Sequence, residues 1–171
     1  MADLHERAVE GRNYIEQLAM KIPGFKGYLD KELRRDTDKI QREFCAKKLT
    51  DSKAAVKSAL NDVISGGDID GIAPFEKLMN RLDAVANKIS FANRGYSGMF
   101  DSIKVGEETL ERVYRFDLSL AEGCSEVAGK IQQFGSVDKA TMLGLVKEAI
   151  TLLGSVEQYF GKREEILKKG D

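Results

Sequence analysis

Several residue types that build catalytic and metal sites are scarce in this chain of 171 residues. It contains no tryptophan, two prolines, two cysteines and a single histidine. A structural zinc site needs about four Cys or His ligands, and a serine hydrolase needs a histidine beside its nucleophile. The one histidine, His5, lies near the N-terminus. The composition therefore argues against both classes of site and predicts no cofactor.

The chain also lacks a charge excess and a long apolar run. Its 27 basic and 28 acidic residues give a net charge of −1, whereas nucleic-acid-binding proteins usually carry a basic excess. No segment approaches the roughly 18–20 apolar residues of a membrane span, and the charged N-terminal segment has no signal-peptide core. Cys45 and Cys124 are far apart in sequence and fit reduced thiols. We therefore expect a cytoplasmic protein with no nucleic-acid partner and no transmembrane segment.

Apolar residues are present at helical spacing along the whole chain. This pattern predicts one all-α domain over residues 1–171, a single bundle of five or six mostly antiparallel helices, because the connections are short. We expect a break at Thr50-Asp51-Ser52, since these residues favour helix N-caps. The expected helices cover 3–20, 26–49, 52–64, 74–89, 106–134 and 137–168.

Two of these helices have informative faces. In 26–49, the pattern places Leu29 and Leu33 on the inner side and Arg34, Asp38 and Arg42 on a solvated side. The C-terminal helix, 137–168, is apolar on two sides. Such a helix is either central in the bundle or half of a homodimer seam, and the sequence leaves both alternatives open.

Asp117 stands out because it falls on the apolar stripe of the helix that begins near residue 106. An unpaired carboxylate there would be costly, so we expect it to be buried and bonded to an arginine. Arg34 and Arg35 are preferred partners over Arg94 and Arg115, because their helix is long enough to run beside Asp117. The site becomes a functional candidate only if it opens onto a pocket beside Tyr114 or Tyr96. The predicted polar group is Asp117, Arg34, Arg35, Tyr114 and Tyr96.

Glu107, Glu108 and Glu111 form the sharpest acidic cluster, with spacings that place them on one helical face. Three carboxylates of this kind suit magnesium. The cluster resembles the first half of the E-E-x-x-E…E-x-x-D pattern of all-α nucleoside triphosphate pyrophosphohydrolases, but no E-x-x-D follows it. The competing interpretation is an acidic helix start that favours the positive end of the helix dipole.

Three stretches of the chain are distinctive: Ile22–Tyr28 with Glu32–Arg35, Gly95–Asp101, and Arg112–Asp117. They resemble a bacterial family of cytosolic helical proteins to which no activity is assigned. The resemblance implies a bacterial cytosolic helical protein. The missing catalytic motifs and the two-sided apolar surface of the C-terminal helix favour a non-catalytic interaction or scaffold protein with an unidentified protein partner, including a homodimer through that helix. The alternative is a magnesium-dependent pyrophosphohydrolase-like enzyme that uses Glu107, Glu108 and Glu111.

Overall fold

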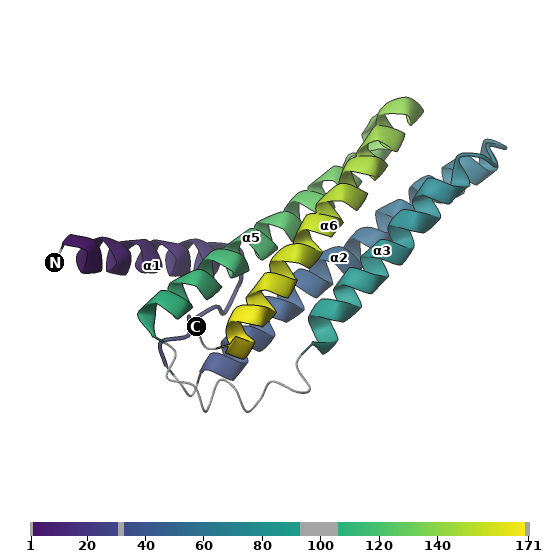
Figure 1. Ribbon diagram of the computed structural model, residues 1–171. Helices are drawn as coiled ribbons and strands as arrows, with labels where there is room; N and C mark the ends of the chain where they lie inside the picture. The colour runs from purple at the N-terminus through teal and green to yellow at the C-terminus, as the bar shows by residue number, and fades with distance from the viewer. Residues whose placement is uncertain (1, 31–32, 93–105, 170–171) are drawn as a thin grey trace.

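The computed structural model describes residues 2–30, 33–92 and 106–169, and this part of the chain is all-α (Figure 1). The predicted fold class is confirmed, because helices hold most of these residues and none of them lies in a strand. In chain order the elements are α1 (Ala2–Lys21), α2 (Arg34–Ser65), α3 (Ile72–Phe91), α5 (Glu107–Gln132), the short 3-10 helix η1 (Phe134–Ser136) and α6 (Lys139–Lys169).

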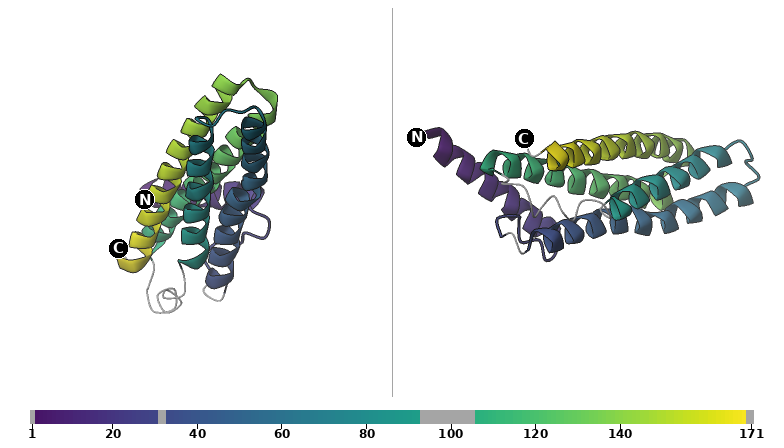
Figure 2. Two further views of the ribbon diagram at one scale, coloured as in Figure 1. Left: turned by 90° about the vertical axis from the view of Figure 1, so that its right-hand side faces the viewer. Right: turned by 60° about the horizontal axis from the view of Figure 1, so that its bottom comes forward.

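Two antiparallel helical hairpins, α2 with α3 and α5 with α6, form the body of the bundle (Figures 1 and 2). The α5–α6 and α2–α3 pairs make the most extensive contacts, and α2 with α5 and α3 with α6 join the hairpins. Both hairpin turns lie at the same end, where Lys139 and Asp68 form an ion pair. We call this the turn end, and the opposite end, where α2 and α5 begin and α6 finishes, the open end.

The course of α2 differs from the sequence expectation at two points. The helix starts at Arg34 instead of residue 26, and it continues through Thr50-Asp51-Ser52 without a break. Instead of capping a new helix, the Ser52 hydroxyl donates to the Lys48 carbonyl one turn earlier at 2.8 Å. The described residues 22–30 and Leu33 lie between α1 and α2, and we call residues 22–30 the connector. One long helix replaces two of those expected.

The two apolar sides of α6 are explained by contacts within the chain. The helix packs against α5 on one side and α3 on another, and Val146, Leu153 and Phe160 are almost fully buried. At Gly123 of α5, an added Cβ would come within 2.8 Å of Val156 of α6, so the two helices approach closely there. These contacts within the chain account for the buried residues of α6, and a homodimer seam stays a prediction.

Helix α1 leaves the body of the bundle and crosses α5, with its N-terminal part extending away (Figures 1 and 2). Among the described elements, α5 is the one with which α1 makes substantial contact. Leu18 is fully buried there and Ile15 is half-buried, whereas Met20 is 80% exposed. The direction of α1 therefore depends on its contact with α5 and on the connector that follows.

The connector turns back into the bundle through two glycines with left-handed backbone angles, Gly24 (φ +84°) and Gly27 (φ +85°). At Gly27 an added Cβ would lie 3.1 Å from the Tyr114 hydroxyl oxygen, so the position requires both the angle and the missing side chain. This tight passage places the next residue, Tyr28, in the core, where it is fully buried.

Candidate functional site: a buried ionic network

Charged side chains meet in the interior of the open end, where the connector, α2, α5 and α6 converge. We call this set the ionic network: Tyr28, Asp38, Arg42, Asp117 and Arg163. Asp117 and Arg163 are fully buried, and Asp38 is 1% exposed. Charges are rarely buried so completely unless they are paired, and here two carboxylates face two guanidinium groups.

Arg163 on α6 is the centre of the ionic network. Its Nε donates to Asp117 Oδ1 at 2.5 Å, and its Nη2 donates to Asp38 Oδ1 at 2.6 Å. Its Nη1 donates to the neighbouring Glu164 at 3.1 Å. One guanidinium thus joins carboxylates from α5 and α2 to α6, and the planar fork of arginine suits this task better than a lysine ammonium would.

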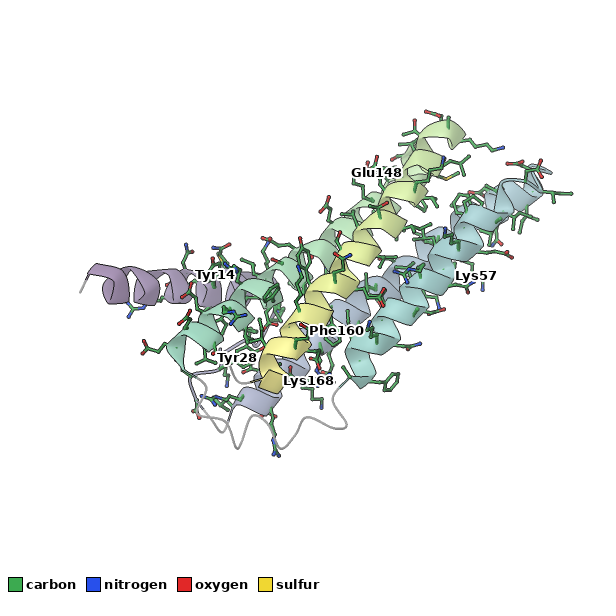
Figure 3. All side chains as sticks on the ribbon, in the orientation of Figure 1. Tyr14, Tyr28, Lys57, Glu148, Phe160 and Lys168 are labelled. Atoms are coloured by element: carbon green, nitrogen blue, oxygen red, sulfur yellow. The ribbon has the colours of Figure 1, made fainter. Side chains whose placement is uncertain are left out.

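Tyr28 is held by its hydroxyl, both its backbone groups and its ring. The hydroxyl donates to Asp117 Oδ2 at 2.5 Å and accepts from Arg163 Nη2 at 3.3 Å. Its backbone N–H donates to the Tyr114 hydroxyl at 2.6 Å, and its carbonyl accepts from Arg34 Nε, also at 2.6 Å. The ring stacks on Tyr114 at a centroid distance of 5.3 Å. Figure 3 shows Tyr28 toward the open end of the bundle. The connector is therefore fastened to the core through this residue.

Asp38 and Arg42 extend the ionic network to the end of α3. Arg42 Nε donates to Asp38 Oδ2 at 2.8 Å, and its Nη1 donates to the Ser90 carbonyl at 3.0 Å. The last carbonyl groups of a helix receive no hydrogen bond from within that helix. The Arg42 guanidinium therefore supplies a donor to one of these carbonyls at the C-terminal end of α3. The ionic network consequently links the connector and four helices.

Burial and charge act in opposite directions on the carboxyl groups. Burial raises the pKa of Asp117, and the Arg163 charge and the Tyr28 hydroxyl offset this only in part. Burial also tends to raise the pKa of Asp38, but the charges of Arg163 and Arg42 together lower this pKa below the ordinary 3.8. Burial raises the pKa of Tyr28 well above 10.0, so its hydroxyl stays protonated and donates to Asp117.

The structure places the predicted polar residues as follows. Asp117 is buried and bonded to an arginine, but the expected partner was wrong, because Arg163 fills that role. Arg35 is exposed, and Arg34 is buried but donates to the Tyr28 carbonyl. Tyr114 lies beside Tyr28, while Tyr96 falls outside the described residues.

The expected solvated side of the second helix was also wrong, because Asp38 and Arg42 point into the bundle. The sequence held a signal for them. The buried positions Leu49 and Cys45 of α2 continue at the same helical spacing to Gln41 and Asp38. Likewise, Arg163 follows Val156 and Phe160 of α6 at spacings of four and three residues. Extending each apolar stripe past its last apolar residue would have identified these groups.

The acidic cluster at the start of α5 does not form a metal site in the structure. Glu107 and Glu108 are exposed and Glu111 is half-buried. Within the described residues, no three His, Cys, Asp or Glu side chains are arranged to hold a metal ion. Glu107 and Glu108 do occupy the first turn of α5, where acidic residues favour the helix dipole.

The ionic network is suited to holding the bundle together and poorly suited to catalysis. Its carboxylates and guanidinium groups are paired with one another, and Asp117 and Arg163 have no solvent exposure through which a substrate could reach them.

In the described segments, no helix combines the length and apolar character that crossing a membrane requires. No family model, curated protein or solved structure matches this chain.

Asp38 should give the protein a specific acid sensitivity. In the unfolded chain its pKa is about 3.8, and in the folded chain the pKa is lower. Its stabilising contribution is therefore present above pH 3.8 and is lost as the pH falls below that value. We expect the stability difference between wild type and Asp38→Asn to narrow over this range. Urea unfolding from about pH 6 to about pH 2.5 measures it.

The matched control for this prediction is Asp51→Asn, because Asp51 is exposed and pairs with Lys47 on the surface of the same helix. The free energy of unfolding of Asp51→Asn should differ little from that of wild type at every pH of the series. A constant difference between wild type and Asp38→Asn across the acid range would show that the Asp38 carboxylate is not stabilised by the fold.

Proposed function

We propose that this chain is a non-catalytic helical interaction protein and that α1 is the element it presents to a protein partner. The observation that carries the proposal is the position of α1, which projects from the bundle and makes substantial contact with α5 alone among the described elements (Figure 2). A helix that only supported the core would be expected to lie along the bundle and bury a longer face.

The buried contacts support this role. The connector that follows α1 is fastened by Tyr28, whose hydroxyl, backbone and ring are all engaged in the core. An ordered connector fixes the direction in which α1 leaves the bundle. A presented helix with a fixed direction loses less conformational entropy when it binds a partner than a flexible one does.

The compartment and assembly state belong to the same proposal. Cys45 and Cys124 are unpaired and buried, which supports a reducing compartment such as the cytoplasm, in keeping with the resemblance to a bacterial cytosolic family. A homodimer through α6 has less support than an interaction through α1, because α6 packs against both α5 and α3 within the chain and buries Val146, Leu153, Val156 and Phe160 there.

Site-specific photocrosslinking in the native cell tests this proposal. A photoreactive residue replaces Met20, which is 80% exposed on α1. The control position is Lys57, which is exposed in the second half of α2 (Figure 3). We expect a discrete protein adduct from position 20 and none from position 57. Equal adducts at both positions, or none at either, would contradict the role of α1.

The enzymatic alternative is tested on the same protein. Magnesium with nucleoside triphosphates should produce neither hydrolysis nor a specific rise in Tm. Hydrolysis that is lost in Glu108→Gln but kept in Glu126→Gln, an exposed position later on α5, would overturn the non-catalytic proposal and assign the chemistry to the acidic cluster.

A further inference from the structure

The connection between α2 and α3, at the turn end of the bundle, exposes two large apolar side chains. Ile69 is 80% exposed and Ile64, in the last turn of α2, is 52% exposed. Connections of this kind are usually built from glycine and short polar residues, and Gly66, Gly67 and Asp68 follow that rule. One exposed apolar residue needs no explanation, but two within six positions form an apolar patch at the tip of the hairpin.

The tip has a defined shape and is attached to the other hairpin. Gly67 adopts a left-handed angle (φ +73°), and its N–H donates to the Ile64 carbonyl at 3.0 Å. The Asp68 carboxylate accepts from the Gly71 N–H and pairs with Lys139, the first residue of α6. The two isoleucines are therefore presented on an ordered turn, and an ordered surface loses less entropy on binding than a flexible one.

The surroundings of the apolar patch are acidic. Residues 61–72 include three aspartates and no lysine or arginine. Lys139 offsets the charge of Asp68, whereas Asp62 and Asp70 are exposed and form no ion pair with a described residue. The patch is therefore flanked by two carboxylates that are open to solvent.

This combination of apolar and acidic groups distinguishes between possible occupants. An anionic membrane surface attracts basic residues and repels carboxylates. A second copy that met the tip through its own tip would place like charges against one another, which is unfavourable. A different protein with an apolar pocket and a rim of lysine or arginine complements both features, because interfaces combine an apolar centre with a polar rim of matching charge.

We propose that the tip of the α2–α3 hairpin docks into a protein partner, which receives Ile69 and Ile64 in an apolar pocket and faces Asp62 and Asp70 with basic side chains. This surface is separate from α1, since the tip and α1 lie at opposite ends of the molecule (Figures 1 and 2). The chain then has two binding surfaces and can hold two proteins at once.

Photocrosslinking in the native cell is the first part of the test. A photoreactive residue replaces Ile69, and mass spectrometry identifies what it captures. The control position is Lys57, which is exposed about two helical turns before Ile64 on α2. We expect a discrete adduct with another protein from position 69 and none from position 57. Capture of lipid or of a second copy, an equal adduct at both positions, or no adduct would overturn the proposal.

The second part measures the Kd of the identified protein for variants of the full chain. Ile64→Ser should raise the Kd by about fivefold or more, since truncation of a pocket-filling residue costs more than about 1 kcal/mol. Asp62→Asn combined with Asp70→Asn should raise the Kd at low salt, and the difference from wild type should shrink as salt is added. All three side chains are exposed, so the variants should keep the wild-type fold.

Asp51→Asn is the matched charge control, because Asp51 is exposed on α2 but lies three turns before the tip. Its Kd should equal that of wild type. A Kd that does not respond to Ile64→Ser, or that responds equally to Asp51→Asn and to the pair of tip variants, would show that the tip is not the docking surface. These results are independent of the crosslinking test at position 20 of α1.

Discussion

Replacing Arg163 with methionine is expected to lower the free energy of unfolding by about 3–5 kcal/mol. The guanidinium is fully buried and bonds to both Asp117 and Asp38. Methionine keeps much of the side-chain volume, so the loss comes mainly from two buried carboxylates left without their shared partner. Urea unfolding at neutral pH measures the change, with a linear extrapolation to water.

Lys162→Met is the matched control, because Lys162 is the exposed neighbour of Arg163 on α6. Its effect should be within about 0.5 kcal/mol. A double-mutant cycle then isolates the pair. Arg163→Met should cost less in an Asp117→Asn background, by an amount within the roughly 0.5–3 kcal/mol found for groups in contact. Equal costs in both backgrounds would show that Arg163 and Asp117 do not stabilise each other.

The helices themselves could be predicted from the sequence because their apolar residues recur with a single period. The prediction failed where a short stretch of sequence is compatible with two different local structures. Thr50-Asp51-Ser52 reads as an N-cap, yet the Ser52 hydroxyl can equally bond to the carbonyl one turn back, which leaves the helix intact. Packing of Leu49 and Val56 on either side of this point decides between the outcomes, and that packing is a tertiary property.

The ionic network could be predicted only in part, for a similar reason. Asp117 was recognisable because a lone acid interrupts an apolar stripe. Its partner was not, because Arg163 lies in a C-terminal run that also includes Lys162 and Lys168, and a basic run also suits the negative end of a helix. Which member of the run faces inward depends on its angular position around the helix relative to Val156 and Phe160. This angular position, rather than the composition of the run, distinguishes the buried arginine from its solvated neighbours.

The connector was the least predictable segment, because residues 26–33 continue the apolar spacing of a helix. The structure instead leaves Leu29 69% exposed and buries Tyr28 completely. Gly24 and Gly27 adopt angles that a right-handed helix does not allow. Once they turn the chain, Tyr28 gains both a ring partner, Tyr114, and a carboxyl acceptor, Asp117. Those contacts come from residues nearly ninety positions away, so no local pattern could reveal them.

Tyr28→Ala should both destabilise the fold and release the direction of α1. Removal of a fully buried aromatic ring costs about 3–5 kcal/mol, and Asp117 also loses the hydroxyl that donates to it at 2.5 Å. Tyr28→Phe keeps the ring and the backbone bonds, so it should cost about 1.5–3 kcal/mol, the range for a hydrogen bond to a charged group. Chemical unfolding of the two variants measures the difference.

The same pair of variants separates the role of the connector from that of the α1–α5 contact. Spin labels at the exposed positions Met20 and Lys57 report the distance between α1 and α2 by pulsed electron spin resonance. Cys45 and Cys124 are buried and should not react with the label. We expect a narrow distance distribution in wild type and Tyr28→Phe and a broad one in Tyr28→Ala, because only the alanine variant loses the ring that fastens the connector. A narrow distribution in Tyr28→Ala would mean that Leu18 and Ile15 against α5 suffice to fix α1, and that the ionic network stabilises the bundle without orienting the helix it presents.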